Sequence, residues 1–467
     1  MNGSAGSASD RLGAAGLDHA AVAAWTAAWQ EQTSDFEHDR AGYSQFWQMS
    51  DDLLGRLPAR PQRRAAEADA ANAVLSAARD HRERFLAAHG ALLYDRLTRD
   101  RSIFVRIEAL VFEAAAAVQG LTPTRQQVAA ENARAQRDKD GIEIDQGIFL
   151  AHVLAGEDSG LHLCHAMLMP RPEAVDLLPK LAADGVVDLG KAEIARRGKA
   201  ALVTMKNPRF LNAEDETTLD LTEIAVDLAI LDPATEIAVI RGGALDHPRY
   251  RGRRVFGSGV NLTHLYRGQI PFVWFLQRDL GFVHKLLRGV ARPEYVPDDV
   301  RGRGIEKPWI AVVDGFAIGG HCQILLTMDY VLAANDAFMT LPARKEGIIP
   351  GLANLRLPRF TGDRIARQAI QYERKLVCDS PEGRLICDEV APLDEIDAAL
   401  ERLVEGLTNA GAVSAIGNRR AFRVVEEPLD LFRRYCSAYA RDQAYCCFSP
   451  ALIANLERNW DAHNRKT

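Results

Sequence analysis

Hydrophobic positions follow two different rhythms along the chain, and the change lies near residue 198. Before it, apolar residues recur every three or four positions in Ala-, Arg- and Glu-rich stretches such as 20–29 and 70–97. This spacing is typical of amphipathic helices. We therefore predict a helical N-terminal domain over residues 17–197, preceded by a disordered tail over residues 1–16, which are mostly small and polar.

From residue 198 onward, short Val-, Ile- and Ala-rich runs alternate with helical stretches. Turn residues bound these runs, and the alternation indicates parallel β-α-β units. We predict a second, α/β domain over residues 198–467. Its expected strands lie at 199–206, 236–243, 307–315 and 329–336, with helices at 214–232 and 321–328.

Composition and charge narrow the classes of partner. A net charge of −6 and a pI near 6.1 argue against nucleic acid or an anionic membrane. No apolar run approaches the roughly 20 residues that cross a bilayer. The first residues lack a basic segment followed by an apolar one, so we expect a cytoplasmic protein.

Seven cysteines are scattered over the chain without CxxC pairs. We expect reduced, mostly buried thiols rather than disulfides. The adjacent Cys446 and Cys447 are more typical of neighbours on a helix than of a redox pair, because such a pair suits disulfide geometry poorly.

Two glycine-containing segments, 253–265 and 307–330, each place a tight turn after a candidate strand. Glycine lets the backbone approach a ligand closely, and the start of a following helix directs free amide groups at it. Two such amides from separate segments can hold a developing oxyanion. Tight turns with a purely structural role are the alternative interpretation.

These segments, with three others, resemble motifs of the crotonase (enoyl-CoA hydratase/isomerase) superfamily. The motifs occur in the family's order over about residues 199–460. The resemblance implies a spiral ββα core, an acyl-CoA substrate, and C-terminal helices that join subunits into homotrimers or homohexamers. In chain order the segments are NPRFLNA (207–213), FGSGVNL (256–262), KPWIAVVDGFAIGGHCQ (307–323), EGIIPGLANLRLPRFTG (346–362) and ICDEVAPLDEI (386–396).

The resemblance also assigns roles to single positions. Val260 and Gly320 would supply the two N–H groups of the oxyanion hole. The residues expected to contact substrate beside the hole are Gly259, Asn261 and Gly319, and those expected beside the adenine and pantetheine of CoA are Arg209, Phe210 and Leu211. For Arg209, an ordinary surface cation is the alternative to this CoA contact.

Both positions at which hydratases carry a catalytic glutamate differ in this chain, which has Gln323 and Ala343 there. Neither side chain can act as a general acid or base. An oxyanion hole alone still acidifies the α-carbon of a thioester, and an arylacetyl thioester needs the least help. The resulting enolate can pass an electron to dioxygen in an apolar pocket without a metal or an organic cofactor.

In these departures from the hydratase pattern, the chain resembles an oxygenase branch of the superfamily. The resemblance implies an oxidoreductase that converts (3,5-dihydroxyphenyl)acetyl-CoA and dioxygen into 3,5-dihydroxyphenylglyoxylate and CoA, for 3,5-dihydroxyphenylglycine in glycopeptide-antibiotic biosynthesis. Arg254 would bind polar groups of the substrate or stabilise peroxide charge, and Gln323 would hydrogen-bond the substrate. Ile324 and Ala343 would line a dioxygen pocket. A solvated arginine is the alternative for Arg254, and ordinary core packing is the alternative for Ile324 and Ala343.

Two other functions remain open from the sequence. One is a CoA-thioester hydrolase or isomerase that uses Glu346 or His321 for proton transfer. The other is a non-catalytic scaffold with the crotonase fold. His162 and His165 are the best candidates for metal ligands, but histidines of the core or surface are commoner, and we expect no metal site.

Overall fold

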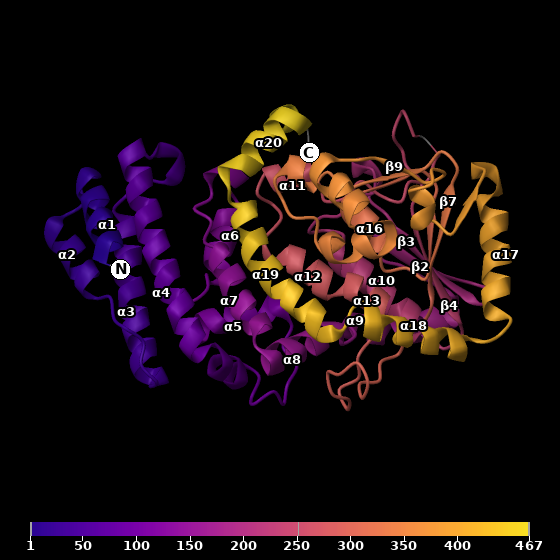
Figure 1. The fold of residues 1–467 in the computed structure, drawn as a ribbon, viewed down its shortest axis with the longest axis horizontal. Helices are drawn as coiled ribbons and strands as arrows, with labels where there is room; N and C mark the ends of the chain where they lie inside the picture. Colours follow the sequence, from indigo (N-terminus) through magenta and orange to yellow (C-terminus); the bar gives the residue numbers. More distant parts are fainter. Residues whose placement is uncertain (1, 251, 466–467) are drawn as a thin grey trace.

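Helices form the first part of the chain in the computed structural model, which describes residues 2–250 and 252–465. Within these residues, nine α-helices precede the first strand. Figure 1 shows the first eight towards one end of an elongated molecule and the sheet towards the other end, with the ninth close to the sheet. They are α1 (Asn2–Ala14), α2 (His19–Ala27), α3 (Phe36–Gly55), α4 (Ala65–Leu97), α5 (Ile107–Ala117), α6 (Arg125–Asn132), α7 (Ile144–Ala155), α8 (Glu157–Leu168) and α9 (Pro172–Asp184).

Helix α1 occupies most of the segment that we expected to be a disordered tail, so that prediction is wrong. Leu12 of α1 is completely buried in a small apolar cluster with Trp25 and Val74. Alanine and leucine are strong helix formers, and burial of one leucine side chain contributes about 1.5–3 kcal/mol. The many small polar residues of the segment concealed this contact.

A seven-stranded sheet is the centre of the second part, in the order β1-β2-β3-β4-β5-β7-β10. Strands from β3 to β10 pair in parallel, which confirms the predicted α/β architecture, and β1 and β2 pair antiparallel at one edge. The strands are β1 (Val186–Asp188), β2 (Ala192–Arg197), β3 (Ala200–Met205), β4 (Ile237–Gly242), β5 (Trp309–Val313), β7 (Tyr330–Ala334) and β10 (Glu389–Ala391).

The boundary predicted at residue 198 falls inside this sheet, because β1 and β2 lie before it. The charged residues of β2, such as Glu193 and Arg197, left only three apolar positions in the strand and hid its period of two. A second, three-stranded sheet carries part of the site. It consists of β6 (Phe316–Ile318), β8 (Phe338–Thr340) and β9 (Leu376–Val377).

Helices of 4 to 20 residues connect the strands, and four further helices follow the last strand. The connecting helices are α10 (Leu219–Leu231), α11 (Leu262–Tyr266), α12 (Val273–Leu280), α13 (Phe282–Arg288), α14 (Gly320–Leu325), α15 (Ala343–Glu346) and α16 (Ala353–Tyr372). The C-terminal helices are α17 (Ile396–Thr408), α18 (Ala412–Glu426), α19 (Leu429–Cys447) and α20 (Pro450–Trp460).

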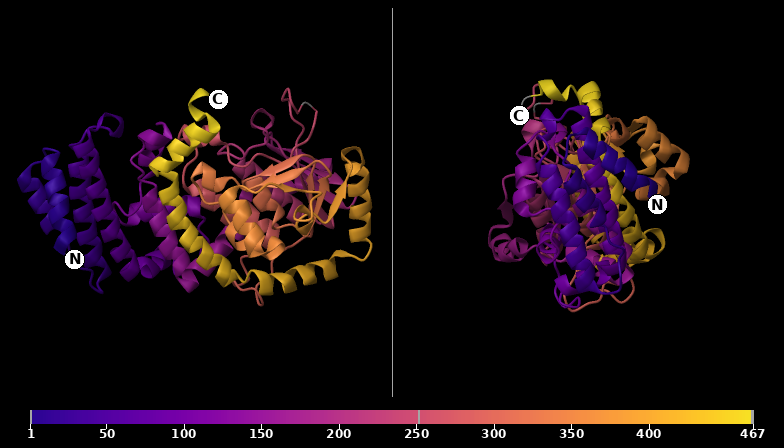
Figure 2. Two further views of the ribbon diagram at one scale, coloured as in Figure 1. Left: turned by 45° about the horizontal axis from the view of Figure 1, so that its top comes forward. Right: turned by 90° about the vertical axis from the view of Figure 1, so that its left-hand side faces the viewer.

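Helix α19 returns from the sheet to the N-terminal helices and lies along α7 (Figure 2). A side chain at Gly147 of α7 would lie 2.5 Å from the Cβ atom of Ala444, so glycine permits this close helix packing. One continuous core therefore contains residues of α7, of α19 and of the sheet.

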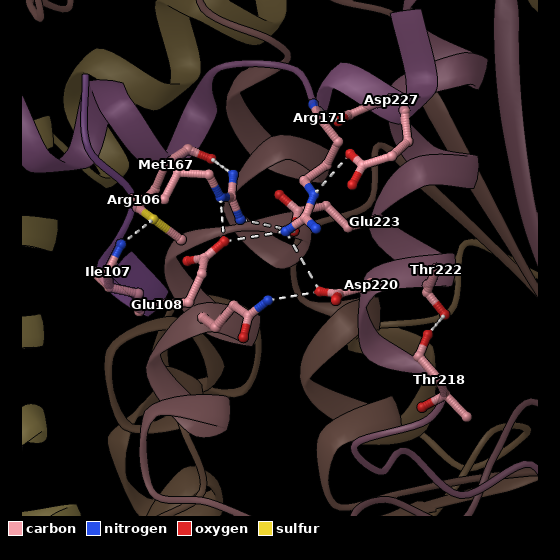
Figure 3. Close-up of polar contacts among 12 residues, drawn as sticks. Arg106, Ile107, Glu108, Met167, Arg171, Thr218, Asp220, Thr222, Glu223 and Asp227 are labelled. Carbon is pink, nitrogen blue, oxygen red and sulfur yellow. Dashed lines mark hydrogen bonds and ion pairs between the residues drawn. The ribbon is translucent and has the colours of Figure 1, made fainter. Parts of the chain in front are cut away.

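A buried cluster of charges also joins the two parts of the chain (Figure 3). Arg106, before α5, contacts Glu223 of α10 at 2.9 Å. The backbone N–H of Arg171 donates to Asp227 of α10 at 2.7 Å. Lys285 of α13 completes the cluster with ion pairs of 2.8 Å to Glu223 and to Asp227. The helical region is therefore fixed to the α/β region by ion pairs and a hydrogen bond whose acidic groups on α10 are completely buried.

All seven cysteines lie in the described residues and are free thiols, which agrees with the expected lack of disulfides. None of the helices that the structure describes combines the length and the apolar character needed to traverse a lipid bilayer.

Candidate active site

The two glycine-containing segments lie side by side in the structure. An isolated parallel bridge pairs Gly257 with Ala317. The N–H of Gly257 donates to the carbonyl of Phe316 at 3.2 Å, and the N–H of Ile318 donates back to Gly257 at 3.0 Å. Gly259 has a φ of +82°, and a side chain there would lie 2.9 Å from the Ile318 carbonyl. Glycine is required at this point by both the backbone angle and the space.

Val260 and Gly320 present unpaired backbone amides at this junction. The N–H of Glu214 donates to the carbonyl of Gly259, and the N–H of Asn261 donates to the carbonyl of Glu214. The N–H of Val260, which lies between these two residues, takes no part in the pairing. Gly320 is the first residue of α14, where an N–H has no partner within the helix. Within the described part of the chain, neither amide donates to a protein acceptor. Two N–H groups are thus available to one ligand.

A narrow inner pocket adjoins these amides, and a wider outer pocket of about 560 Å³ continues from it. The pockets share Ser258, Val260 and Glu346. The other residues that line the inner pocket are Glu214, Gly259, Trp274, Phe275, Arg278, Asp279, Gly319, Gly320, Gln323, Ala343, Ile348, Ile349, Pro350, Gly351 and Tyr439.

Arg278 of α12 connects the polar wall of the inner pocket. Its guanidinium donates at 2.7 Å to Glu214, to Asp279 and to the carbonyl of Gly320, and at 3.1 Å to Gln323 Oε1. Burial alone would lower the pKa of Arg278, but the two carboxylates raise the pKa above its ordinary value. The side chain is therefore charged, buried and held by four acceptors.

Glu214 has one carboxylate oxygen in this network and one without a partner. Oε1 accepts from Arg278, whereas Oε2 is buried with no hydrogen bond among the described residues. A side chain at Gly320 would lie 2.3 Å from Oε2, so this oxygen lies directly beside the second amide of the predicted oxyanion hole. It is an acceptor for an O–H or N–H group of a ligand.

The structure brings together ten of the twelve predicted site residues. Asn261 also begins α11, where its side chain caps the helix by accepting from the N–H of His264. Those in the inner pocket are Gly259, Val260, Gly319, Gly320, Gln323 and Ala343. Those in the outer pocket are Arg209, Phe210, Leu211 and Asn261, with Val260 in both.

Arg254 and Ile324 lie elsewhere, and their predicted roles are corrected. The Arg254 side chain is 47% exposed and lies 3.9 Å from Asp397 in a separate groove beside α17. Side chains alternate in an extended segment, so Arg254 points away from the buried Val255. Ile324 follows Gln323 on α14, and the turn of about 100° per residue directs it into the core.

Sequence reasoning missed Glu214, Arg278 and Asp279. A signal was present for two of them, because an adjacent Arg and Asp interrupt the apolar run PFVWFLQRDLGF at 271–282. Charged residues are almost never fully buried unless they are paired, and α12 buries both. Tyr439 gave no signal, since it reaches the pocket from α19 only through the tertiary fold.

His321 supports the glycine segment 253–265 from behind. Its Nδ1 accepts the N–H of Gly259 at 3.0 Å. Burial lowers the pKa of His321 to about 4, so the ring is neutral at pH 7. The side chain is completely buried and lines neither pocket. The geometry therefore assigns His321 to support of this segment and does not favour proton transfer by it.

The two candidate metal ligands of α8 are engaged by the protein. His162 Nδ1 bonds to the hydroxyl of Tyr94 at 2.7 Å, and His165 Nε2 bonds to the carbonyl of Arg292 at 3.1 Å. Phe104 packs against both rings, each at 4.9 Å between centroids. Both histidines are therefore packed and hydrogen-bonded within the helical region.

Comparison with known proteins gives concordant matches. The family described as enoyl-CoA hydratase/isomerase matches residues 289–422. The (3,5-dihydroxyphenyl)acetyl-CoA 1,2-dioxygenase of Amycolatopsis orientalis is 47% identical over 410 residues, which cover 88% of this chain and 93% of that protein. The carnitinyl-CoA dehydratase of Salmonella typhi is 24% identical over 244 residues, 52% of this chain and 84% of that protein.

Among solved structures, an enoyl-CoA hydratase from Mycobacterium avium subsp. paratuberculosis K-10 is 22% identical, with a TM-score of 0.47 over 58% of this chain and 98% of that one. The family match and the long match to the dioxygenase establish the relationship. The chain belongs to the enoyl-CoA hydratase/isomerase (crotonase) superfamily.

Proposed function

We propose that this protein is a cofactor- and metal-independent dioxygenase of an arylacetyl-CoA thioester, with (3,5-dihydroxyphenyl)acetyl-CoA as its substrate. The products are 3,5-dihydroxyphenylglyoxylate and CoA, and the arylglyoxylate would be the precursor of 3,5-dihydroxyphenylglycine for glycopeptide antibiotics. The observation that carries the proposal is the pair of unpaired amides, Val260 and Gly320, in a pocket with Gln323 and Ala343 at the hydratase positions. Similarity to the dioxygenase of A. orientalis over 93% of its length supports it.

The two amides stabilise the enolate. The thioester carbonyl accepts both N–H groups, and these bonds strengthen when the α-proton leaves and negative charge moves to the oxygen. One donor of this kind contributes about 2.7–4 kcal/mol to a transition state. The carbanion carbon of the enolate is then electron-rich and lies in a pocket from which Gln323 and Ala343 deliver no proton.

The polar wall of the inner pocket suits a hydroxylated ring. The unpaired Oε2 of Glu214 accepts a phenolic O–H, and Arg278 keeps the neighbouring oxygen in place. An acceptor left buried without a donor costs about 1–3 kcal/mol. A substrate without ring hydroxyls leaves Glu214 in that state, so this wall favours the dihydroxyphenyl group. Gln323 contributes a hydrogen-bonding amide that cannot exchange protons.

An apolar wall faces these polar groups. Ala343 and Ile348 line the inner pocket and would have the role that the sequence suggests for Ala343 and Ile324. Trp274 and Phe275 of α12 extend this surface. Such a surface accommodates dioxygen, which is small and apolar.

The outer pocket suits the CoA portion. Arg209, Lys345 and Arg465 bring positive charge to its rim, where phosphates bind. Phe210 and Trp460 offer aromatic faces to the adenine. Helix α20 supplies the side of the pocket opposite the glycine segments, so the C-terminal helices close the CoA site.

We also propose a homotrimer or homohexamer. Helix α18 buries two arginines, Arg419 and Arg423, and exposes apolar side chains instead. Val413 is 87% exposed, Phe422 is 65% exposed and Val425 is 81% exposed. Phe422 and Val425 are three residues apart and therefore lie on one face of the helix. Exposed apolar side chains grouped in this way mark an interaction site, and light scattering tests the oligomeric state directly.

The proposed reaction is tested with labelled dioxygen. The atoms of arylacetyl-CoA and one dioxygen molecule equal those of the arylglyoxylic acid and CoA, so no water is required. The product formed under ¹⁸O₂ should therefore contain two ¹⁸O atoms by mass spectrometry. CoA release that continues at full rate without dioxygen would indicate a hydrolase and exclude the oxygenase.

A variant tests the site itself. Val260→Pro removes one oxyanion donor and should lower turnover by about 100- to 1,000-fold. Undiminished turnover would mean that this amide is not part of the hole. A scaffold without catalytic function would show neither turnover nor a rise in melting temperature with acyl-CoA.

A further inference from the structure

Glu346 is the titratable residue at the junction of the two pockets. Of the three residues that line both pockets, Val260 offers its backbone amide and Ser258 uses its hydroxyl to bond the carbonyl of Phe210 at 3.1 Å. The proposed thioester carbonyl binds at Val260, and its α-carbon is one bond away from that carbonyl. Glu346 therefore borders the space in which the α-carbon must lie.

The surroundings of Glu346 favour proton exchange. Its carboxyl group has no hydrogen-bond partner among the described residues. Burial, with a smaller contribution from the charge of Glu373, raises the pKa of Glu346 to about 7, and Lys345 partly opposes this shift. Lys345 is itself held by Glu373 at 3.3 Å. A carboxyl group with a pKa close to the working pH can both accept and return a proton.

The other acidic groups near the hole are paired with a cation, although Glu214 keeps Oε2 without a hydrogen bond in the described part of the chain, and the nearby histidine lies outside both pockets. Glu214 and Asp279 are in ion pairs with Arg278 across the inner pocket. His321 is behind the glycine segment 253–265, and its Nδ1 already accepts from Gly259. Glu346 is thus distinguished from the other acidic groups of the inner pocket by the lack of a cationic partner at its carboxylate.

The position of Glu346 on α15 explains how a carboxylate reaches this place. Ala343, at the first position of the same helix, occupies the position of a hydratase glutamate. Residues three apart on a helix are neighbours on one face. Glu346 therefore presents its side chain on the face of Ala343, one turn further along and closer to the outer pocket.

We infer that Glu346 is the general base of the reaction. Its carboxylate removes one α-proton from the arylacetyl thioester, the C–H bond breaks, and the electron pair forms the enolate whose oxygen is held by Val260 and Gly320. Glu346 then carries the proton. When the C–S bond breaks later, the proton passes to the CoA thiolate and the carboxylate is restored. This inference rests on the proposed function, because it names the proton acceptor of that site.

The test is exchange of the α-protons in deuterated buffer without dioxygen. Under these conditions the enolate is reprotonated by solvent-derived deuterons, and mass spectrometry measures the deuterium in recovered (3,5-dihydroxyphenyl)acetyl-CoA. Glu346→Gln should slow exchange by about 100-fold or more. Glu346→Asp keeps the carboxyl group and should retain more exchange than the glutamine variant. Glu395→Gln, at an exposed glutamate outside both pockets, is the matched control and should exchange like the wild type.

The pH profile gives a second readout. Because the base must be ionised, the wild-type exchange rate should fall as the pH decreases through about 7. The residual rate of Glu346→Gln should lack this acidic limb. The charged groups that face Glu346 are Lys345, Glu373, Glu214, Arg278 and Asp279, and all remain in the variant. Exchange within threefold of wild type, with the same limb, would overturn the inference.

The two proposals fail in different ways. Wild-type protein that exchanges deuterium but consumes no dioxygen would refute the dioxygenase and leave the role of Glu346 intact. Wild-type protein that consumes dioxygen, with an equally fast Glu346→Gln variant, would refute only the base. Melting temperatures show whether each variant is folded. If the glutamine variant does not fold, the pH profile of the wild type decides, and an exchange rate without an acidic limb near pH 7 would overturn the inference.

Discussion

The backbone N–H of Gly259 donates a 3.0 Å hydrogen bond to Nδ1 of His321, which joins the two glycine segments at the predicted oxyanion hole. Gly259 precedes one amide of the hole and His321 follows the other. The ring also fills the space beside Gly257, where a side chain would lie 2.2 Å from its Nε2. The relative position of the two amides therefore depends on a neutral imidazole.

This dependence predicts a loss of stability in acid. The pKa of His321 is about 4 in the folded state and near 6.5 when unfolded, so between these values the unfolded chain binds the extra proton. Stability due to His321 is complete above pH 6.5 and is lost as the pH falls towards 4, by about 3 kcal/mol. Urea denaturation at a series of pH values measures it.

His321→Asn separates the hydrogen bond from the titration, because its side-chain oxygen can accept from Gly259 and does not titrate. Its free energy of unfolding should depend less on pH between 4 and 6.5 than that of the wild type. His321→Leu should lose activity at every pH, because it has no acceptor. An asparagine variant with the full wild-type pH dependence would assign the effect to other groups.

Arg278 is predicted to be essential for both folding and turnover. Arg278→Met leaves Glu214 and Asp279 buried without their cation, which typically costs 3–5 kcal/mol. Denaturant unfolding and kcat/KM measure the two effects. Arg254→Gln is the matched control, because Arg254 is half-exposed and outside both pockets, and it should change stability by no more than about 0.5 kcal/mol. A large loss of turnover in the control would indicate that Arg254 does take part in the site.

Gly320→Ala is predicted to disrupt the hole without disturbing the rest of the fold. The added Cβ atom would lie 2.3 Å from Glu214 Oε2 and 3.0 Å from Arg278, so this polar wall must shift. Turnover should fall by at least tenfold. Gly406→Ala meets open space within α17 and should stabilise the protein by about 1 kcal/mol, as alanine does in helices. Equal activities of both variants would contradict the prediction.

Glu143 is predicted to position α12 from the helical region. Its carboxylate accepts the backbone N–H of Phe272 at the start of α12, the helix that carries Arg278. Glu143→Ala removes this acceptor and should destabilise the protein by about 0.5–2 kcal/mol, as loss of a helix cap does. It should also lower kcat for a dihydroxyphenyl substrate more than for the unsubstituted phenylacetyl thioester. An equal change for both substrates would argue against positioning.

The local motifs were predictable, and the residues that depend on tertiary packing were not. Val260 and Gly320 belong to contiguous segments whose glycines carry the signal, and the structure places both at the pocket. Arg254 was chosen because it lies next to such a segment in sequence, whereas the arginine in the pocket, Arg278, comes from a helix between the two segments. The only local signal for Arg278 was the Arg-Asp pair within an apolar run, and no local pattern indicated the approach of Tyr439 from α19.

The four acceptors of Arg278 have a consequence for selectivity. One guanidinium contacts Glu214, which faces the proposed ring hydroxyl, and the carbonyl of Gly320, whose amide faces the thioester. Ring and thioester are therefore recognised by one rigid unit. A substrate analogue without hydroxyls should bind through its CoA portion with little loss, yet react slowly, because the missing contact serves the transition state more than the ground state. Discrimination among aryl groups would then be expressed in kcat.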